Sequence, residues 1–115
     1  VRRSTLLVNV TNDAWFGDST APHQHLDISR MRSLETGRPM LRATNDGVTA
    51  LIAHDGSVLG QLPQFEPGVL TGVIVPRDGM TPYTRSGNLP VLVLLALAIG
   101  GSLYWPRLRA RRVAA

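Results

Sequence analysis

The stretch with the most evident chemical potential is Asn12-Asp13-Ala14-Trp15-Phe16-Gly17, which follows directly on the apolar run 6–10. Such a run predicts a buried strand that delivers polar and aromatic side chains to its C-terminal end. In open α/β sheets, ligands bind at that end. Trp15 and Phe16 could line a pocket for a fatty chain, since each buried CH₂ contributes ~0.8 kcal/mol. The alternative is that both rings pack in the core.

Histidines follow shortly afterwards, with His23 and His25 flanking Gln24. The neighbouring acids do not complete a recognised metal-ligand pattern, so no metal site is predicted. We expect His25 to lie at a helix start and to bond the Trp15 loop. Its ordinary pKa also suits a general base, but none of the serines stands in a nucleophile-elbow context.

Two further polar groups stand out. Arg32 and Glu35 are three residues apart on a predicted helix, close enough to pair. We expect an ion pair at the edge of the buried face, which supports the scaffold. The stretch Asn45-Asp46-Gly47 predicts a tight turn with Gly47 at positive φ.

Composition excludes several classes of function. The chain of 115 residues has no cysteine, and all twelve basic residues are arginine, so disulfides, thiolate metal sites and lysine chemistry are absent. The net charge of +4 is a property of the C-terminal end, because residues 1–88 carry eight arginines and all eight acids. Nucleic-acid binding would require basic residues spread over a face, and no nucleic-acid partner is predicted.

Residues 1–75 predict a mixed α/β unit. After the first strand, a helix is expected over 24–36, stopped by Gly37 and Pro39, with Ile28, Met31 and Leu34 in one apolar band. An Asp-Gly hairpin turn is expected at 54–57. The following ranges predict further strands, arranged as a meander rather than as βαβ repeats: 40–44, 48–53, 58–62 and 69–75.

The sequence after residue 75 differs in composition from the α/β unit. Residues 76–88 predict a linker, and the uncharged apolar run 89–105 predicts a transmembrane helix at the short limit of ~17–25 residues. Tyr104 and Trp105 suit an interfacial belt, and the arginine-rich tail 106–115 predicts a cytoplasmic C-terminus, with the α/β part in the periplasm. A buried helix of a soluble domain is the alternative.

Several of these stretches together resemble apolipoprotein N-acyltransferases, which are membrane-bound members of the nitrilase (carbon–nitrogen hydrolase) superfamily. The similarity begins at Asn12–Gly17 and continues in family order almost to the C-terminus. It includes His25 and the following stretches: 30–35, 45–50 and 81–88. This order is more specific than any single motif.

The resemblance implies the C-terminal part of a nitrilase-like αββα sandwich followed by one transmembrane helix, in the bacterial inner membrane. It implies transfer of a fatty acyl group from a phospholipid to the N-terminal diacylglyceryl-cysteine of lipoproteins, through a cysteine thioester and without a cofactor. It places pocket-wall residues at Asn12, Trp15, Phe16, His25 and Asn45, and supporting residues at Arg32 and Glu35.

The Cys, Lys and Glu that perform this chemistry in the family have no counterpart here, so no catalytic residue is assigned. Neither Glu35 nor Glu66 stands in the family's motif for the base. We therefore expect a C-terminal fragment that is inactive alone. There are two alternatives. The chain could belong to a membrane-tethered nitrilase-like amidase, or it could be a non-catalytic single-pass membrane protein.

Overall fold

The computed structural model describes residues 3–113, with side chains of the last helix described as far as Tyr104. The chain divides into two compact units, Val1–Thr84 and Arg85–Ala115. The boundary falls inside the short helix α2 (Pro82–Ser86).

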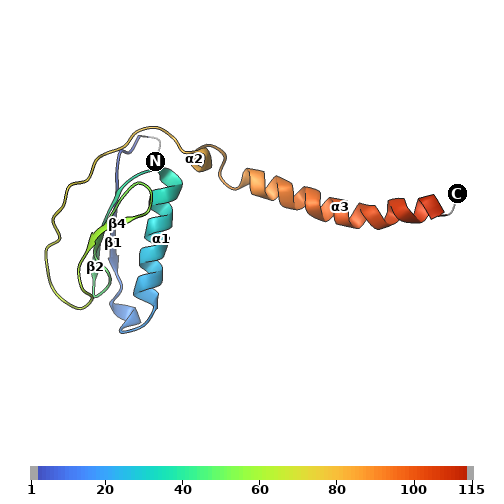
Figure 1. Ribbon diagram of the computed structural model, residues 1–115. Helices are drawn as coiled ribbons and strands as arrows, with labels where there is room; N and C mark the ends of the chain where they lie inside the picture. Colours follow the sequence, from blue (N-terminus) through green and yellow to red (C-terminus); the bar gives the residue numbers. More distant parts are fainter. Residues whose placement is uncertain (1–2, 114–115) are drawn as a thin grey trace. The chain divides into compact units, whose positions relative to one another are not determined.

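The first unit is built on a four-stranded sheet with the order β1-β2-β3-β4, and helix α1 (Ala21–Thr36) runs alongside this sheet (Figure 1). Its strands are β1 (Leu7–Asn12), β2 (Met40–Asn45), β3 (Ala50–Ile52) and β4 (Val58–Gln61). β1 and β2 are parallel, joined through helix α1 (Ala21–Thr36), whereas β2, β3 and β4 form an antiparallel meander. The mixed α/β class is confirmed. The meander expected after the helix is confirmed over β2, β3 and β4, whereas β1 pairs with β2 in parallel and therefore needs the crossover connection through α1.

Helix α1 ends at Thr36 as expected, and it begins at Ala21, three residues before the expected range 24–36. A proline lies in its first turn, and Gly37 adopts the left-handed conformation at the C-terminal cap with φ 64°. Glycine suits this position because it has no Cβ to clash. The Thr20 side chain makes no capping hydrogen bond. The Ser19 hydroxyl accepts a hydrogen bond from the Ala21 amide instead.

The face of α1 that packs on the sheet differs from the expected one. The side chains of Ile28, Met31 and Leu34 are each at least half exposed. The buried residues of the helix are mostly small or hydroxylated: Pro22, Leu26, Ser29, Ser33 and Thr36. The apolar band was therefore assigned to the wrong face. The physical reason is that this helix lies over a buried arginine of β2, which needs polar partners. The small apolar core consists of Leu26, Met40, Val48, Ala50 and Ile52, with Leu7 and Val58 against it.

Two local predictions are also wrong. The expected strand over 69–75 is irregular in the structure, and its valines at 69 and 73 are among the most exposed apolar residues. A strand is stabilised by a neighbouring ladder, and the described part of the chain provides none there. At the β2–β3 turn the residue with positive φ is Asp46 (57°), not Gly47. The Asp-Gly hairpin turn is confirmed, with Gly56 at φ 81°.

The second unit consists of helix α3 (Leu89–Val113) with the end of α2. The range 89–105 is helical as expected, and the helix continues to Val113. A transmembrane helix needs ~20 mostly apolar residues, and among the described residues no helix is long and apolar enough to cross a membrane. The side chains of Trp105 and of the predicted tail 106–115 lie outside the described part.

Candidate functional site

The predicted site lies where the parallel strands β1 and β2 end. Asn12 and Asn45 are the last residues of these strands and lie opposite each other in the register. The Asn12 side-chain oxygen accepts hydrogen bonds from the Ala14 amide at 3.1 Å and from the Asn45 side chain at 3.5 Å. The Asp13 amide donates to the Asn45 carbonyl at 3.2 Å. The two asparagines therefore tie together the turns that follow the two strands.

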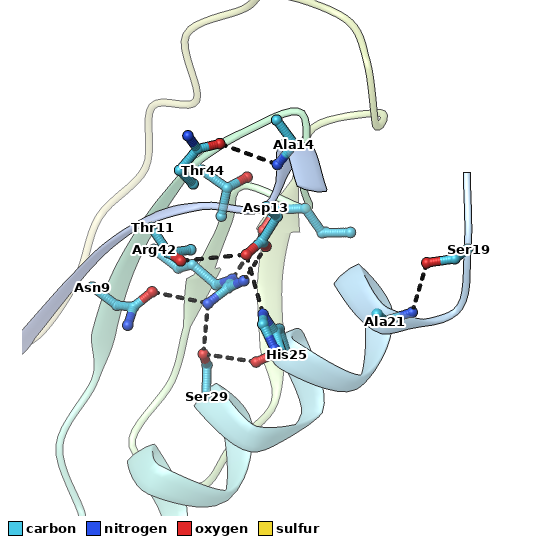
Figure 2. A network of polar contacts seen from close by, with 12 residues as sticks. Asn9, Thr11, Asp13, Ala14, Ser19, Ala21, His25, Ser29, Arg42 and Thr44 are labelled. Carbon is cyan, nitrogen blue, oxygen red and sulfur yellow. Dashed lines mark hydrogen bonds and ion pairs between the residues drawn. The ribbon is translucent and has the colours of Figure 1, made fainter. Parts of the chain in front are cut away.

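Asp13 is the centre of the polar network at this edge (Figure 2). Its side chain is fully buried. The Oδ1 atom accepts a hydrogen bond from the Thr11 hydroxyl at 3.3 Å and lies 3.1 Å from Nδ1 of His25. The Oδ2 atom lies 2.8 Å from the Arg42 guanidinium. A buried carboxylate is costly unless it is paired and hydrogen-bonded, and both oxygens of Asp13 meet that condition.

Arg42 supplies the positive charge and is itself almost completely bonded. Its side chain is only 3% exposed. Besides Asp13, it donates to the Val48 carbonyl at 3.2 Å, to Asn9 Oδ1 at 2.8 Å and to Ser29 Oγ at 3.0 Å. Burial lowers the pKa of Arg42, and the Asp13 carboxylate opposes that shift. An arginine nevertheless stays protonated in proteins, so the pair is ionic.

Gly47 closes the site from the side of the β2–β3 turn. A Cβ at this position would collide with the carboxylate and Cβ of Asp13. The glycine is therefore required for close approach rather than for positive φ. Its neighbour Asp46 takes the left-handed conformation instead, which Asn and Asp tolerate better than most residues.

His25 links this buried pair to the aromatic turn η1 (Ala14–Phe16). Its imidazole is 38% exposed and is held by Asp13 through Nδ1. The Phe16 ring meets it edge-on, with centroids 5.0 Å apart and an interplanar angle of 84°. Trp15, at the tip of the turn, is 84% exposed. The prediction that His25 lies near the helix start, where it is in place to hold the Trp15 loop, agrees with these contacts. The alternative that Trp15 packs in the core of this chain does not.

The five predicted pocket residues share one end of the sheet but not one cavity. Asn45 lines a cavity of about 300 Å³ between the β2–β3 turn and the loop after β4. His25 lines a separate cavity of about 220 Å³ together with residues of β1, β2 and α1. Neither of these two cavities includes Asn12, Trp15 or Phe16.

Arg32 and Glu35 lie away from this cluster on α1. They form the predicted ion pair, with 2.8 Å between Arg32 NH1 and Glu35 Oε2. Arg32 is 60% exposed and Glu35 is 21% exposed, so the cation of this pair lies at the surface and the acid is partly buried. Exposed pairs of this kind contribute roughly 0.2–1 kcal/mol, which is less than the buried-pair cost of ~3–5 kcal/mol. The ion pair that is truly buried is Asp13–Arg42.

Sequence reasoning missed Asp13, Arg42 and Gly47 as site residues. One signal was present: Arg42 follows Met40 at a spacing of two, which places both on the same face of a strand. A charge on the core face of a strand needs a buried partner, and Asp13 at the end of the neighbouring strand provides it. Nothing in the sequence identified which acid that partner would be.

The arrangement orients an imidazole and an aromatic turn, but it contains no candidate nucleophile. The hydroxyls that bond directly to Asp13 and Arg42 are those of Thr11 and Ser29, which donate to Asp13 and to the His25 carbonyl, respectively. Within residues 3–113, no three His, Cys, Asp or Glu side chains are grouped so that they could hold a metal ion.

Comparison with known proteins identifies the class. The family model for carbon-nitrogen hydrolases matches residues 2–80, and the chain belongs to this family. More particularly, it is similar to proteins named apolipoprotein N-acyltransferase. The protein from Ralstonia nicotianae is 57% identical over 83% of this chain and 19% of its own length. The Vibrio cholerae protein is 49% identical over 91% of this chain and 21% of its own, and that of Methylococcus capsulatus is 56% identical over 82% and 19%. The chain thus spans about a fifth of these curated relatives.

Proposed function

We propose that this chain serves in apolipoprotein N-acylation, as the part of an N-acyltransferase that forms one side of the acyl-handling site. The observation that carries the proposal is its similarity to proteins of that name over more than four fifths of its length, at 57% and 56% identity. The acyl donor would be a phospholipid, and the acceptor the N-terminal diacylglyceryl-cysteine of a lipoprotein. The setting would be the periplasmic side of the bacterial inner membrane.

The exposed aromatic turn supports a role in handling an acyl chain. Trp15 and Phe16 stand at the carboxyl ends of the parallel strands, where α/β sheets bind ligands. Exposed large apolar side chains at such a place commonly mark a binding surface. We assign Trp15 and Phe16 to the pocket wall, together with Asn12, His25 and Asn45. Arg32 and Glu35 are assigned to support of helix α1.

The transfer itself requires residues that this sequence does not contain. In the proposed reaction a cysteine thiolate attacks the ester carbonyl of the phospholipid and releases the lysophospholipid. The acceptor amine then attacks the thioester, the thiolate leaves, and a proton is lost from the amine. Since the chain has no cysteine and no lysine, we propose that it is inactive alone.

The test uses a full-length N-acyltransferase that carries this segment. Conversion of a diacylated lipoprotein to the triacylated form is followed by mass spectrometry. Trp15→Ala and Phe16→Ala should lower the rate without loss of folded protein, and Val73→Ala, an exposed apolar residue away from the turn, is the control. Lipoproteins that remain diacylated with the parent protein would refute the proposal.

The second candidate is an amidase of the same family, since the family match alone is equally compatible with small-amide hydrolysis. Release of ammonia from small amides by the full-length protein, with no acyl transfer, would favour it. Absence of both activities would leave the non-catalytic alternative.

A further inference from the structure

The aromatic turn η1 has little packing of its own. None of its three residues is buried, and its tip, Trp15, is the part most open to solvent. Its conformation therefore depends on contacts with the residues that precede it and with helix α1. Before the turn, the Asn12 side chain accepts a hydrogen bond from the Ala14 amide, next to Asp13. On the helix, the His25 ring contacts the Phe16 ring.

The two oxygens of the Asp13 carboxylate have different charged or polar partners, His25 and Arg42. Oδ1 faces His25 and so determines which way the imidazole ring is turned. Oδ2 faces Arg42. A change at either oxygen would rotate the carboxylate and shift the other partner. Figure 2 shows the resulting chain of contacts from Arg42 through Asp13 to His25.

Arg42 is the fixed end of this chain of contacts. Its other donors bond β1 through Asn9, α1 through Ser29 and the β2–β3 turn through Val48. Ser29 also donates to the backbone carbonyl of His25, so the histidine is held at both its ring and its backbone. A planar guanidinium with several fixed acceptors has one orientation only.

We infer that Arg42 and Asp13 are positioning residues for the Trp15–Phe16 turn, acting through the ring of His25. The inference deepens the proposed function and rests on it for the role of the turn in acyl transfer. In this arrangement Arg42 and Asp13 do not touch substrate. They hold the aromatic wall in one position, and a displacement of about 1 Å in such a wall can lower a rate ~100-fold.

The first experiment measures the turn directly and needs no activity. In a Trp105→Phe background, Trp15 is the only tryptophan, so its fluorescence anisotropy and its quenching by iodide report the order of the turn. His25→Asn keeps an amide donor where Nδ1 stands, whereas His25→Gln places it where Nε2 stands. We expect the asparagine variant to keep most of the parent's anisotropy and the glutamine variant to lose it.

Other outcomes overturn the inference. Unchanged anisotropy in His25→Gln would show that the turn is ordered without His25. An equal loss in both variants would show that the ring contact with Phe16, and not the bond to Asp13, orders the turn. Arg32→Gln, which breaks the surface ion pair on the same helix, is the matched control and should leave the anisotropy unchanged.

The second experiment adds Asp13→Asn and Arg42→Lys and measures kcat and KM in a full-length acyltransferase, normalised to folded protein. We expect kcat to fall about 10- to 100-fold with little change in KM, and His25→Asn to retain more activity than His25→Gln. Should Arg42→Lys fail to fold, the His25 pair still decides. A folded Asp13→Asn protein with normal kcat and normal Trp15 anisotropy would refute the inference. A parent protein without acyltransferase activity would refute the proposed function but leave the fluorescence test intact.

Discussion

Gly47 lies so close to the Asp13 carboxylate that no side chain fits between them. This contact joins the β2–β3 turn to the end of β1, at the point where the buried ion pair is formed. Gly47→Ala must therefore displace either the turn or the carboxylate. We expect it to lower the free energy of unfolding by about 1–3 kcal/mol.

Chemical denaturation of the two proteins measures this difference. Gly60→Ala is the matched control, because a Cβ there would meet only a leucine side chain at an ordinary 3.5 Å. A Gly47→Ala protein as stable as the Gly60→Ala protein would show that the two segments are not in contact.

Two of the ion pairs of the α/β unit, Arg42–Asp13 and Arg32–Glu35, should differ strongly in their contribution to stability. Arg42→Met leaves the buried carboxylate of Asp13 without its cation and should cost ~3–5 kcal/mol. Arg32→Met removes a cation that is 60% exposed and should cost less, about 1 kcal/mol. Thermal unfolding of both variants beside the parent tests the contrast, and similar losses in the two would contradict it.

The hairpin turn predicts a measurable pH effect. Hydrogen bonds from the Ser57 hydroxyl and amide lower the pKa of Asp55 below its ordinary value of 3.8. Ionised Asp55 therefore favours the folded state above that ordinary pKa, and the contribution is lost as the pH falls through the lower folded-state value. In Ser57→Ala, an NMR titration of the Asp55 carboxylate should give a higher pKa than in the parent. An unchanged titration would exclude the hydroxyl as the main cause.

Arg38 should hold two distant segments together. It is almost fully buried and donates to the carbonyls of Ser4 and Gly79, both at 2.6 Å. Close by, the Arg77 amide donates to the Thr5 carbonyl at 2.9 Å. Because a hydrogen bond to a charged donor contributes ~1.5–3 kcal/mol, Arg38→Met should speed hydrogen exchange at the Arg77 amide. Arg30→Met, which removes a more exposed arginine from a carbonyl of the hairpin turn, should not.

Local signals predicted the α/β unit well where one residue type decides the conformation. Gly37 ended the helix and Gly56 formed the hairpin turn, since only glycine adopts those conformations without strain. The strands expected over 6–10, 40–44, 48–53 and 58–62 correspond to β1, β2, β3 and β4. The strand expected over 69–75 failed because its residues have strand propensity but no neighbouring ladder, and propensity is a weak guide without pairing.

The candidate site residues taken from the sequence lie at the surface of the site, and the buried ion pair beneath them was missed. Trp15 and His25 are conspicuous by type and order along the chain, so a resemblance to a family could identify them. Asp13 and Arg42 are ordinary residues until the fold buries them, and they lie 29 positions apart. Their partnership depends on the parallel register of β1 and β2 and on the side of α1 that faces the sheet. Hydrophobic spacing pointed to the opposite side of that helix.

The parallel pairing that sets Asn9 opposite Arg42 also gives the chain a means of rejecting misaligned strands. Side chains alternate between the two faces of a sheet, so a slip of β2 by one residue would turn the guanidinium outward and bring Leu41 or Ala43 under the helix. The Asp13 carboxylate would then be buried without a counter-charge, which is strongly unfavourable. An apolar residue at position 42 would tolerate either alignment, whereas the arginine accepts only one.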